Sequence, residues 1–336
     1  MIYSIAYSRD GSFIAAGLDR GGVKIWDISN RTDVFLGGYT GENSVSYSTI
    51  EIISFSPDGN YLASFGISDI KIWYGRNWAQ ERILERPRIH KNMSSRDAVH
   101  WDMENRQIIC IGGGFMVRWN IDTGRIVDIV SGVQFGMYFG PILAINPNGT
   151  QFARSNIPGE NYDILLWNIR ENRQEGILTG HTGIRKMEYS PDGNYILTIE
   201  TISKTVSGSS RMLGDIIRLW DTRSLSEVYN IEIEIDDGSI HSANFSPNGN
   251  FFVARLPGRL ILFDTATGKE VSIYNNPTIN DRGMFSDVVF SPDGNFMAIG
   301  IDHDLRIWNI STGEYMDILA SEREDVCYHE LYRRGD

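Results

Sequence analysis

Histidine is the side chain most often recruited for metal binding and acid–base chemistry, and the 336-residue sequence holds six of them. They are His90, His100, His181, His241, His303 and His329. None lies at the His-x-His or His-Glu-x-x-His spacing that brings two imidazoles to one metal ion. The spacing therefore predicts no metal site, and we expect no cofactor.

Motifs for nucleophilic or phosphate chemistry are also missing from the sequence. No Gly-x-Ser-x-Gly elbow and no Cys–His pairing signature occurs. The glycine run 112–114 lies between two strand-like segments, whereas a phosphate-binding loop leads into a helix. A turn explains this run, so we predict that the chain is not an enzyme.

The totals favour a soluble intracellular binding protein. A net charge of −12 disfavours nucleic acid and anionic membranes, which attract basic surfaces, and fits basic partners. The two cysteines, Cys110 and Cys327, exclude a disulfide framework and indicate a reducing compartment. No signal peptide and no apolar stretch of membrane-helix length is visible, so we expect a cytoplasmic or nuclear protein.

One repeated pattern is an apolar segment that ends in a turn of the Ser-Pro-Asp-Gly type. Proline fixes φ, Asp or Asn bonds its own backbone and glycine takes a positive φ, so each copy predicts a tight hairpin turn. The copies are Ser8–Gly11, Ser56–Gly59, Asn146–Gly149, Ser190–Gly193, Ser246–Gly249 and Ser291–Gly294, with a degenerate copy at Met103–Arg106.

A second pattern follows each turn: a short strand that closes on an aromatic residue, usually with Asp or Asn after it. The aromatics recur every 43 to 53 residues, as Trp26, Trp73, Trp119, Trp167, Trp220, Phe263 and Trp308. Seven turns thus interleave with seven aromatics. Each unit reads as four antiparallel strands, which bury both faces only by stacking into a ring. We predict an all-β, seven-bladed β-propeller over 1–320, with a tail at 321–336.

This joint recurrence of turn and Trp-Asp signals resembles the WD-repeat (WD40) family over nearly the whole chain. In that family a His, a strand Ser or Thr, a turn Asp and the Trp form a hydrogen-bonded chain within a blade. Only Gly180-His181 matches the family's Gly-His pair. The resemblance therefore implies one such chain, made by His181, Thr198, Asp215 and Trp220.

The ends depart from the family, whose propellers usually borrow an N-terminal strand for the last blade. Here 3–8 already looks like an inner strand and 314–320 like the last outer strand. We therefore expect that the first and last blades share no strand. Either side-chain packing closes the ring, or the sequence is part of a longer protein. In addition, we expect the tail 321–336 to cover the seam.

Long connections point to the working surface. By the family's geometry, the connections between units and the insertion at 200–214 open on one face around the central channel, which we call the long-loop face. Because function usually lies on loops carried by a rigid scaffold, we expect partner binding there. The expected contact residues are Arg20, Glu51, His100, Tyr162, Arg185, His241, Asp287 and His303.

Two Trp strands end in similar tetrads, Trp167-Asn168-Ile169-Arg170 and Trp220-Asp221-Thr222-Arg223. The second matches the Trp-Asp-x-Arg motif of WD-repeat substrate receptors for cullin-4 ubiquitin ligases. That resemblance implies a ligase-adaptor contact by Arg170 and Arg223 on the opposite face. A solvated polar turn is the alternative.

We interpret the chain as a non-enzymatic scaffold that binds other proteins or peptides, and the sequence does not fix its oligomeric state. An acidic segment, 231–237, either protects an outer edge strand or docks a basic peptide. A propeller hydrolase or lactonase with a channel metal is the enzymatic alternative. It needs inward carboxylates or histidines, whereas the first strands carry mostly Ile, Val, Ala, Phe and Tyr.

Overall fold

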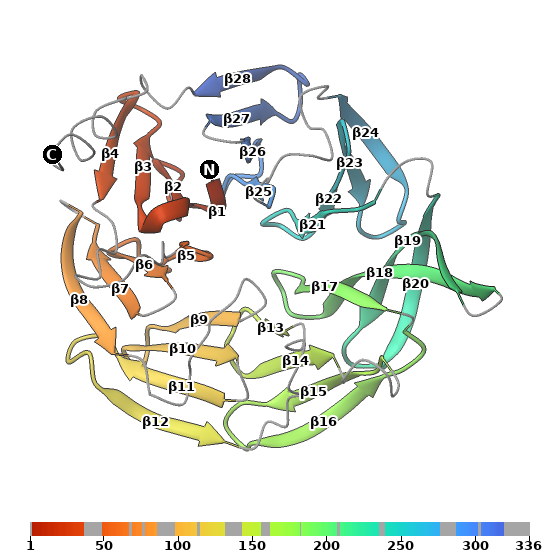
Figure 1. The fold of residues 1–336 in the computed structure, drawn as a ribbon, viewed down its shortest axis with the longest axis horizontal. Helices are drawn as coiled ribbons and strands as arrows, with labels where there is room; N and C mark the ends of the chain where they lie inside the picture. The colour runs from red at the N-terminus through yellow and green to blue at the C-terminus, as the bar shows by residue number, and fades with distance from the viewer. Residues whose placement is uncertain are drawn as a thin grey trace, which may run out of the picture.

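A computed structural model describes residues 2–36, 49–66, 69–75, 78–85, 98–112, 115–131, 143–155, 162–181, 183–206, 209–234, 239–275, 287–301 and 304–318. These residues form seven four-stranded antiparallel sheets arranged in a ring, as Figure 1 shows. The prediction of a seven-bladed β-propeller is therefore confirmed. The tail at 321–336 and the residue His303 lie outside the described residues.

Each blade is one continuous stretch of sequence, numbered here 1 to 7 along the chain, with its strands paired in chain order. Blade 1 holds β1 (Ile2–Tyr7), β2 (Phe13–Leu18), β3 (Val23–Asp27) and β4 (Thr32–Leu36). Blade 2 holds β5 (Ile52–Phe55), β6 (Tyr61–Phe65), β7 (Asp69–Tyr74) and β8 (Ala79–Glu85). Blade 3 holds β9 (Ala98–Asp102), β10 (Gln107–Gly112), β11 (Phe115–Asn120) and β12 (Ile126–Ser131). Blade 4 holds β13 (Leu143–Ile145), β14 (Gln151–Ser155), β15 (Ile164–Asn168) and β16 (Arg173–Leu178).

The remaining blades follow the same plan. Blade 5 holds β17 (Ile184–Tyr189), β18 (Tyr195–Val206), β19 (Ser209–Asp221) and β20 (Ser226–Glu234). Blade 6 holds β21 (Ser242–Phe245), β22 (Phe251–Leu256), β23 (Arg259–Asp264) and β24 (Glu270–Asn275). Blade 7 holds β25 (Val289–Phe290), β26 (Phe296–Ile301), β27 (Asp304–Asn309) and β28 (Tyr315–Ile318). One short 3₁₀ turn, η1 (Asp19–Gly21), joins β2 to β3. Among the described residues, blades 1 and 7 share no strand, as expected, and apolar side chains of the two blades pack across the seam.

The Ser-Pro-Asp-Gly segments join the first and second strands, as predicted. In blade 2, Ser56 Oγ donates to Asp58 Oδ1 over 2.6 Å and accepts from the amide of Tyr61 over 2.9 Å. Gly59 has φ of 71°, which an alanine would adopt only with strain. The turn therefore satisfies its own polar groups and fixes where the second strand starts.

These turns also pack on one another around the ring. The turn glycine of a blade lies against the turn proline of the preceding blade at four interfaces, namely Gly193 on Pro147, Gly249 on Pro191, Gly294 on Pro247 and Gly11 on Pro292. Blade 1 has Arg9 and blade 3 has Glu104 where the other five blades have proline, and the Arg9 guanidinium donates to Pro57 O over 2.7 Å. The face that carries these turns, which we call the short-turn face, therefore takes part in packing between blades.

The core lies between blades. The repeated aromatics are at most 5% exposed except the half-buried Trp167. Trp26, for example, packs with Ile2 of its own blade and with Ala298 and Leu305 of blade 7. Because every blade buries apolar side chains against both neighbours, the closed ring accounts for the repeat observed in the sequence.

The insertion at 200–214 forms the extended ends of β18 and β19, which pair as far as Val206 and Ser209. In Figure 1 this hairpin projects beyond the outer edge of the ring and not over the channel. On the neighbouring β20, Ile231 and Ile233 pack on the blade 5–6 core while Glu232 and Glu234 are exposed, as the alternation predicted. Residues 235–237 of the acidic segment lie outside the described residues.

Candidate functional site at the channel mouth

The antiparallel topology defines two faces. First and third strands start, and second and fourth strands end, on the long-loop face; the other face carries the Ser-Pro-Asp-Gly and Trp-strand turns. Of the predicted contact residues, Arg185, His241 and Asp287 come from the starts of blades 5, 6 and 7. They lie on three consecutive blades, and we call these residues, together with the neighbouring Lys186, Glu188, Asn244 and Arg255, the channel-mouth cluster.

Arg185 is held in place by a buried carboxylate. Its guanidinium forms an ion pair with Asp215, whose side chain is fully buried, while the Arg185 side chain remains 36% exposed. Asp215 Oδ2 also accepts a hydrogen bond of 2.7 Å from the amide of Ile240. The residue after Ile240 is the exposed His241. The buried acid therefore ties blade 5 to blade 6 and presents one guanidinium to solvent in a fixed position.

One ion pair connects blade 5 with blade 7. Lys186 Nζ on β17 lies 2.7 Å from Asp287 Oδ2 at the start of blade 7, a pairing between blades that are not neighbours. The Asp287 side chain is 54% exposed. An ion pair this exposed contributes about 0–1 kcal/mol to stability, so a partner that separates Lys186 from Asp287 and binds either side chain loses little free energy.

Glu188 lies two residues after Lys186 on the same strand, β17. It accepts hydrogen bonds from the side chain of Asn244 and the amide of Phe245, and burial raises its pKa to about 7. Glu188 Oε2, Asn244 Oδ1 and the Oγ of Ser242 are buried without a hydrogen-bond partner among the described residues. The cluster thus holds acceptors that a ligand group could satisfy.

Blade 6 contributes a further cationic side chain near Asp287. Arg255 on β22, only 5% exposed, pairs across the sheet with Ser242, and Asp287 acts on it electrostatically. Burial lowers the pKa of Arg255 to about 10. The site therefore combines three cationic side chains with two acidic ones, and the buried Asp215 behind it pairs with Arg185.

A buried network lies behind the site in blade 5. His181 Nδ1 is 2.7 Å from Glu200 Oε1, Thr198 Oγ1 donates to the same oxygen over 2.9 Å, and Trp220 Nε1 donates to Thr198 Oγ1 over 3.3 Å. The prediction that Asp215 is the acid of this chain is wrong; Glu200 is. The long β18–β19 hairpin removes the turn expected near 215, so Asp215 lies mid-strand opposite Thr201 and bonds blade 6 instead.

The prediction that His100 lies on the long-loop face is also wrong. His100 is the third residue of β9, paired with Ile109, and its imidazole packs on Gly149 in the Asn146–Gly149 turn of blade 4. Burial lowers the pKa of His100. This histidine fills the place where other interfaces have a turn proline, because the turn of blade 3 has none.

The other predicted contact residues are scattered. Glu51 and Tyr162 are half-buried, just before β5 and β15, and Arg20 lies in η1. Arg170 and Arg223 are exposed in the Trp-strand turns of blades 4 and 5, on the short-turn face. Their amides donate to Asn168 Oδ1 and Asp221 Oδ1, which fixes the backbone and leaves the guanidinium groups at the surface.

Within the described part of the chain, no three His, Cys, Asp or Glu side chains gather in a way that could hold a metal ion. In the same residues, no helix is long and apolar enough to span a membrane.

Sequence reasoning missed Lys186, Glu188, Asn244 and Arg255, as well as Glu200. A usable signal was present in β17, where Lys186-Met187-Glu188-Tyr189 alternates polar and apolar residues. Met187 and Tyr189 pack on blade 4, so the polar pair must point the other way.

Comparison with known proteins agrees with this geometry. The family model described as WD domain, G-beta repeat matches residues 1–27, 172–221 and 278–309. The chain is 24% identical over 238 residues to Protein FIZZY-RELATED 3 of Arabidopsis thaliana, covering 59% of this chain and 47% of that protein. It is 24% identical over 237 residues to Protein hir1 of Schizosaccharomyces pombe, covering 61% and 25%.

A third relative, Periodic tryptophan protein 2 of Arabidopsis thaliana, is 23% identical over 236 residues, covering 68% of this chain and 23% of its own length. The chain therefore spans less than half the length of each of these relatives. Seven four-stranded blades and three matched segments support a WD-repeat β-propeller.

Proposed function

We propose that this propeller is a non-enzymatic scaffold that binds a protein or peptide segment at the channel-mouth cluster of blades 5 to 7. The observation that carries the proposal is the convergence there of Arg185, Lys186, Glu188, Arg255 and Asp287 from three blades. WD-repeat relatives of the chain make a binding role the natural one for the fold.

The cluster has the energetic properties of a binding site. Arg185 is already ordered by Asp215, so a partner that contacts its exposed part does not have to immobilise a flexible side chain. Arginine is also among the residues that concentrate binding energy at interfaces. Glu188 and Asn244 hold buried acceptors without partners, so a donor supplied by the ligand recovers their lost hydrogen bonds.

The partner we propose carries both a hydrogen-bond donor or cation and an acidic or carbonyl group. The first suits Glu188 and Asp287, and the second suits Lys186 and Arg185. An extended peptide offers such groups at regular spacing along its backbone and side chains. A basic segment, as the net charge of −12 favours, is the version we expect.

The test begins with affinity capture by the intact propeller, followed by binding measurements on the captured partner. We expect the charge-swapped variant Lys186→Asp/Asp287→Lys to weaken binding at least tenfold, about 1.4 kcal/mol, because the ion pair remains but both charges move. Simple reversal of Arg185 is a poor test, since it would place two carboxylates side by side at the buried Asp215. Unchanged affinity in the swapped variant would refute this location.

The second candidate function is substrate receptor of a cullin-4 type ubiquitin ligase. It is favoured by the exposed Arg170 and Arg223 on neighbouring blades, in turns that fix their backbones. Arg170→Glu/Arg223→Glu serves as the matched control on the opposite face. Loss of binding in this variant alone would move the working surface to the short-turn face and support the receptor function.

A further inference from the structure

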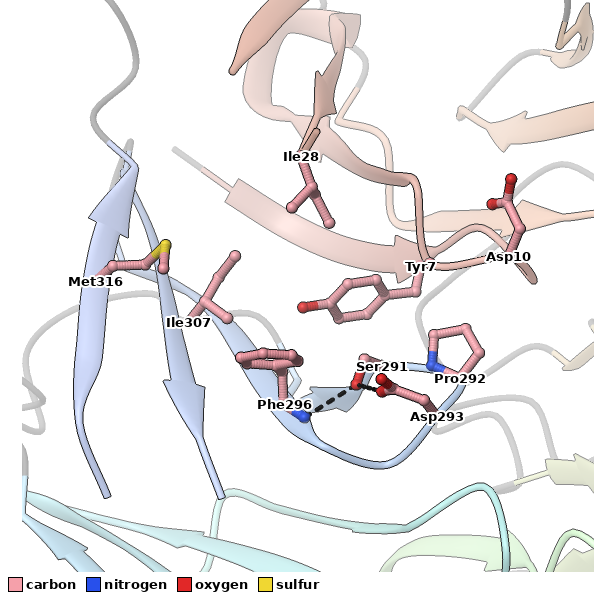
Figure 2. A pocket seen from close by; sticks show the side chains of 10 residues that line it. Tyr7, Asp10, Ile28, Ser291, Pro292, Asp293, Phe296, Ile307 and Met316 are labelled. Carbon is pink, nitrogen blue, oxygen red and sulfur yellow. Dashed lines mark hydrogen bonds between the residues drawn. The ribbon is translucent and has the colours of Figure 1, made fainter. Parts of the chain in front are cut away.

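The seam between blades 7 and 1 contains a cavity of about 230 Å³. Figure 2 shows Tyr7 pointing its hydroxyl into this space between Ile28, Ile307 and Phe296, with Met316 at the outer side. The volume is below the range of about 300–1,000 Å³ that is usual for small-molecule sites. It is large enough for one ring-sized side chain, since a cavity of about 150 Å³ holds benzene.

Each of the two seam blades also presents one exposed apolar side chain on its seam-facing side. Met316 pairs with Ile307, which packs on blade 1, so Met316 faces the seam from blade 7. Phe35 pairs with Lys24, on the same face of β3 as Trp26, so Phe35 faces the seam from blade 1. The two side chains are 54% and 60% exposed, the highest values among the large apolar residues described.

Both seam blades also differ from the others in their outer hairpins. In blades 2 to 6 the register of the third and fourth strands shifts by a bulge just before the repeated aromatic. Blades 1 and 7 have no such shift. The seam is therefore the interface at which neither blade carries this bulge, whereas both blades carry it at the four interfaces from blade 2 to blade 6.

Similar hollows lie between blades 1 and 2 and between blades 5 and 6. The seam differs because β28 ends there, at Ile318, two residues after Met316. The 18 residues that follow include the apolar and aromatic run Val326-Cys327-Tyr328 and the segment Leu331-Tyr332-Arg333-Arg334. At about 3.3 Å per residue, nine residues extend to about 30 Å, enough to turn back along a four-residue strand.

We propose that the segment 326–334 of this chain docks along the seam and places an aromatic side chain in the cavity lined by Tyr7, Ile28 and Met316. Charge supports the same occupant. The cavity rim carries Asp10 and Asp293, and hydrogen bonds from the hydroxyls of Ser8 and Ser291 hold the pKa of each carboxyl below its usual range. Arg333 and Arg334 follow the aromatic Tyr332 directly.

Docking of this kind adds a clamp where the ring has no shared strand. Since the segment is tethered a few residues away, its effective concentration at the seam is on the order of millimolar. A weak contact is then enough to keep it in place. The segment also covers Met316, which removes an exposed apolar side chain beside the cavity from the surface.

Disulfide trapping in the full-length chain tests the proposal, because Cys327 lies in the proposed segment and Cys110 is buried. Under mild oxidation, Ile28→Cys should form an intrachain disulfide with Cys327 at least fivefold faster than Ile310→Cys. Ile310 is the matched control, since it follows the Trp strand of blade 7 as Ile28 follows that of blade 1, but packs on the blade 6–7 core. Adding Cys327→Ser should abolish the product.

Oxidation of Met316 by peroxide gives a second readout that leaves the propeller unchanged. The rate of sulfoxide formation should rise at least threefold in Tyr328→Ser/Tyr332→Ser, while that of the buried Met187 stays constant. Equal trapping rates at 28 and 310 would overturn the proposal, as would a Met316 rate that the tail substitutions leave unchanged. Disulfide-linked dimers in place of the intrachain product would also overturn it, by assigning the cavity to a second copy.

Discussion

Substitution of Gly149 by alanine measures the packing of His100 against the turn of blade 4. Gly149 and Gly59 occupy the same turn position with φ of 69° and 71°. Both substitutions therefore carry the same left-handed backbone cost, about 1–2 kcal/mol. They differ in surroundings: a methyl group at 59 meets nothing within 4 Å, whereas one at 149 would lie 2.6 Å from His100 Cδ2. Displacing the imidazole should add about 1–3 kcal/mol.

The assay is urea denaturation followed by tryptophan fluorescence for Gly59→Ala, Gly149→Ala, His100→Ala and the double variant of 100 and 149. We expect Gly149→Ala to destabilise more than Gly59→Ala, and the excess to disappear when His100 is also alanine, because the cycle isolates the pairwise contact. Equal losses in the two glycine variants would refute the placement of His100 between the blades.

Three further outcomes follow from the hydrogen bonds and burial. Because burial raises the pKa of Glu188 to about 7 from an ordinary 4.5, the folded state binds the extra proton, so the free energy of unfolding should fall as pH rises from about 4.5 to 7; Glu188→Gln should flatten this slope in pH-dependent denaturation. Glu200→Ala should lower the free energy of unfolding by about 3–5 kcal/mol, because it leaves buried polar groups without a partner. The exposed Glu232→Ala should change it by no more than about 0.5 kcal/mol, and calorimetry measures both variants. Tyr229→Phe should cost about 1 kcal/mol in urea denaturation, since it removes the 2.7 Å bond to Thr265 O; no loss would mean that water replaces it.

The propeller itself was predictable because its signals are local. A proline, an Asp or Asn and a glycine fix a turn whatever surrounds them, and Ser56–Gly59 adopts the expected geometry with Ser56, Asp58 and Tyr61 bonded as the turn chemistry requires. Sevenfold repetition then leaves ring closure as the way to bury both faces of every sheet.

The site residues were harder to predict because their partners are far apart in sequence. Lys186 and Asp287 are separated by 101 positions, and the sequence around each residue does not indicate that their side chains pair. Asp215 looked like the acid of the histidine network by spacing, but the strands of blade 5 continue through that position and the turn that would direct its carboxylate to His181 does not form. His100 was misplaced by two residues of register, which suffices to move it from the rim to the interior of an interface.

Asp58 on the short-turn face and Glu188 at the channel mouth differ in how completely their carboxylates are hydrogen-bonded, and this difference argues for the location of the binding site. On the short-turn face, Asp58 accepts bonds from Ser56 Oγ, from the amide of Asn60 and from its side chain. A partner gains little by competing for groups that already have their hydrogen bonds. At the channel mouth, Glu188 Oε2 and Asn244 Oδ1 are buried with no partner among the described residues, so a donor placed there recovers free energy that folding left unrecovered. Partner affinity should therefore depend on Glu188→Leu far more than on Asp58→Leu, and the reverse order would place the partner on the short turns.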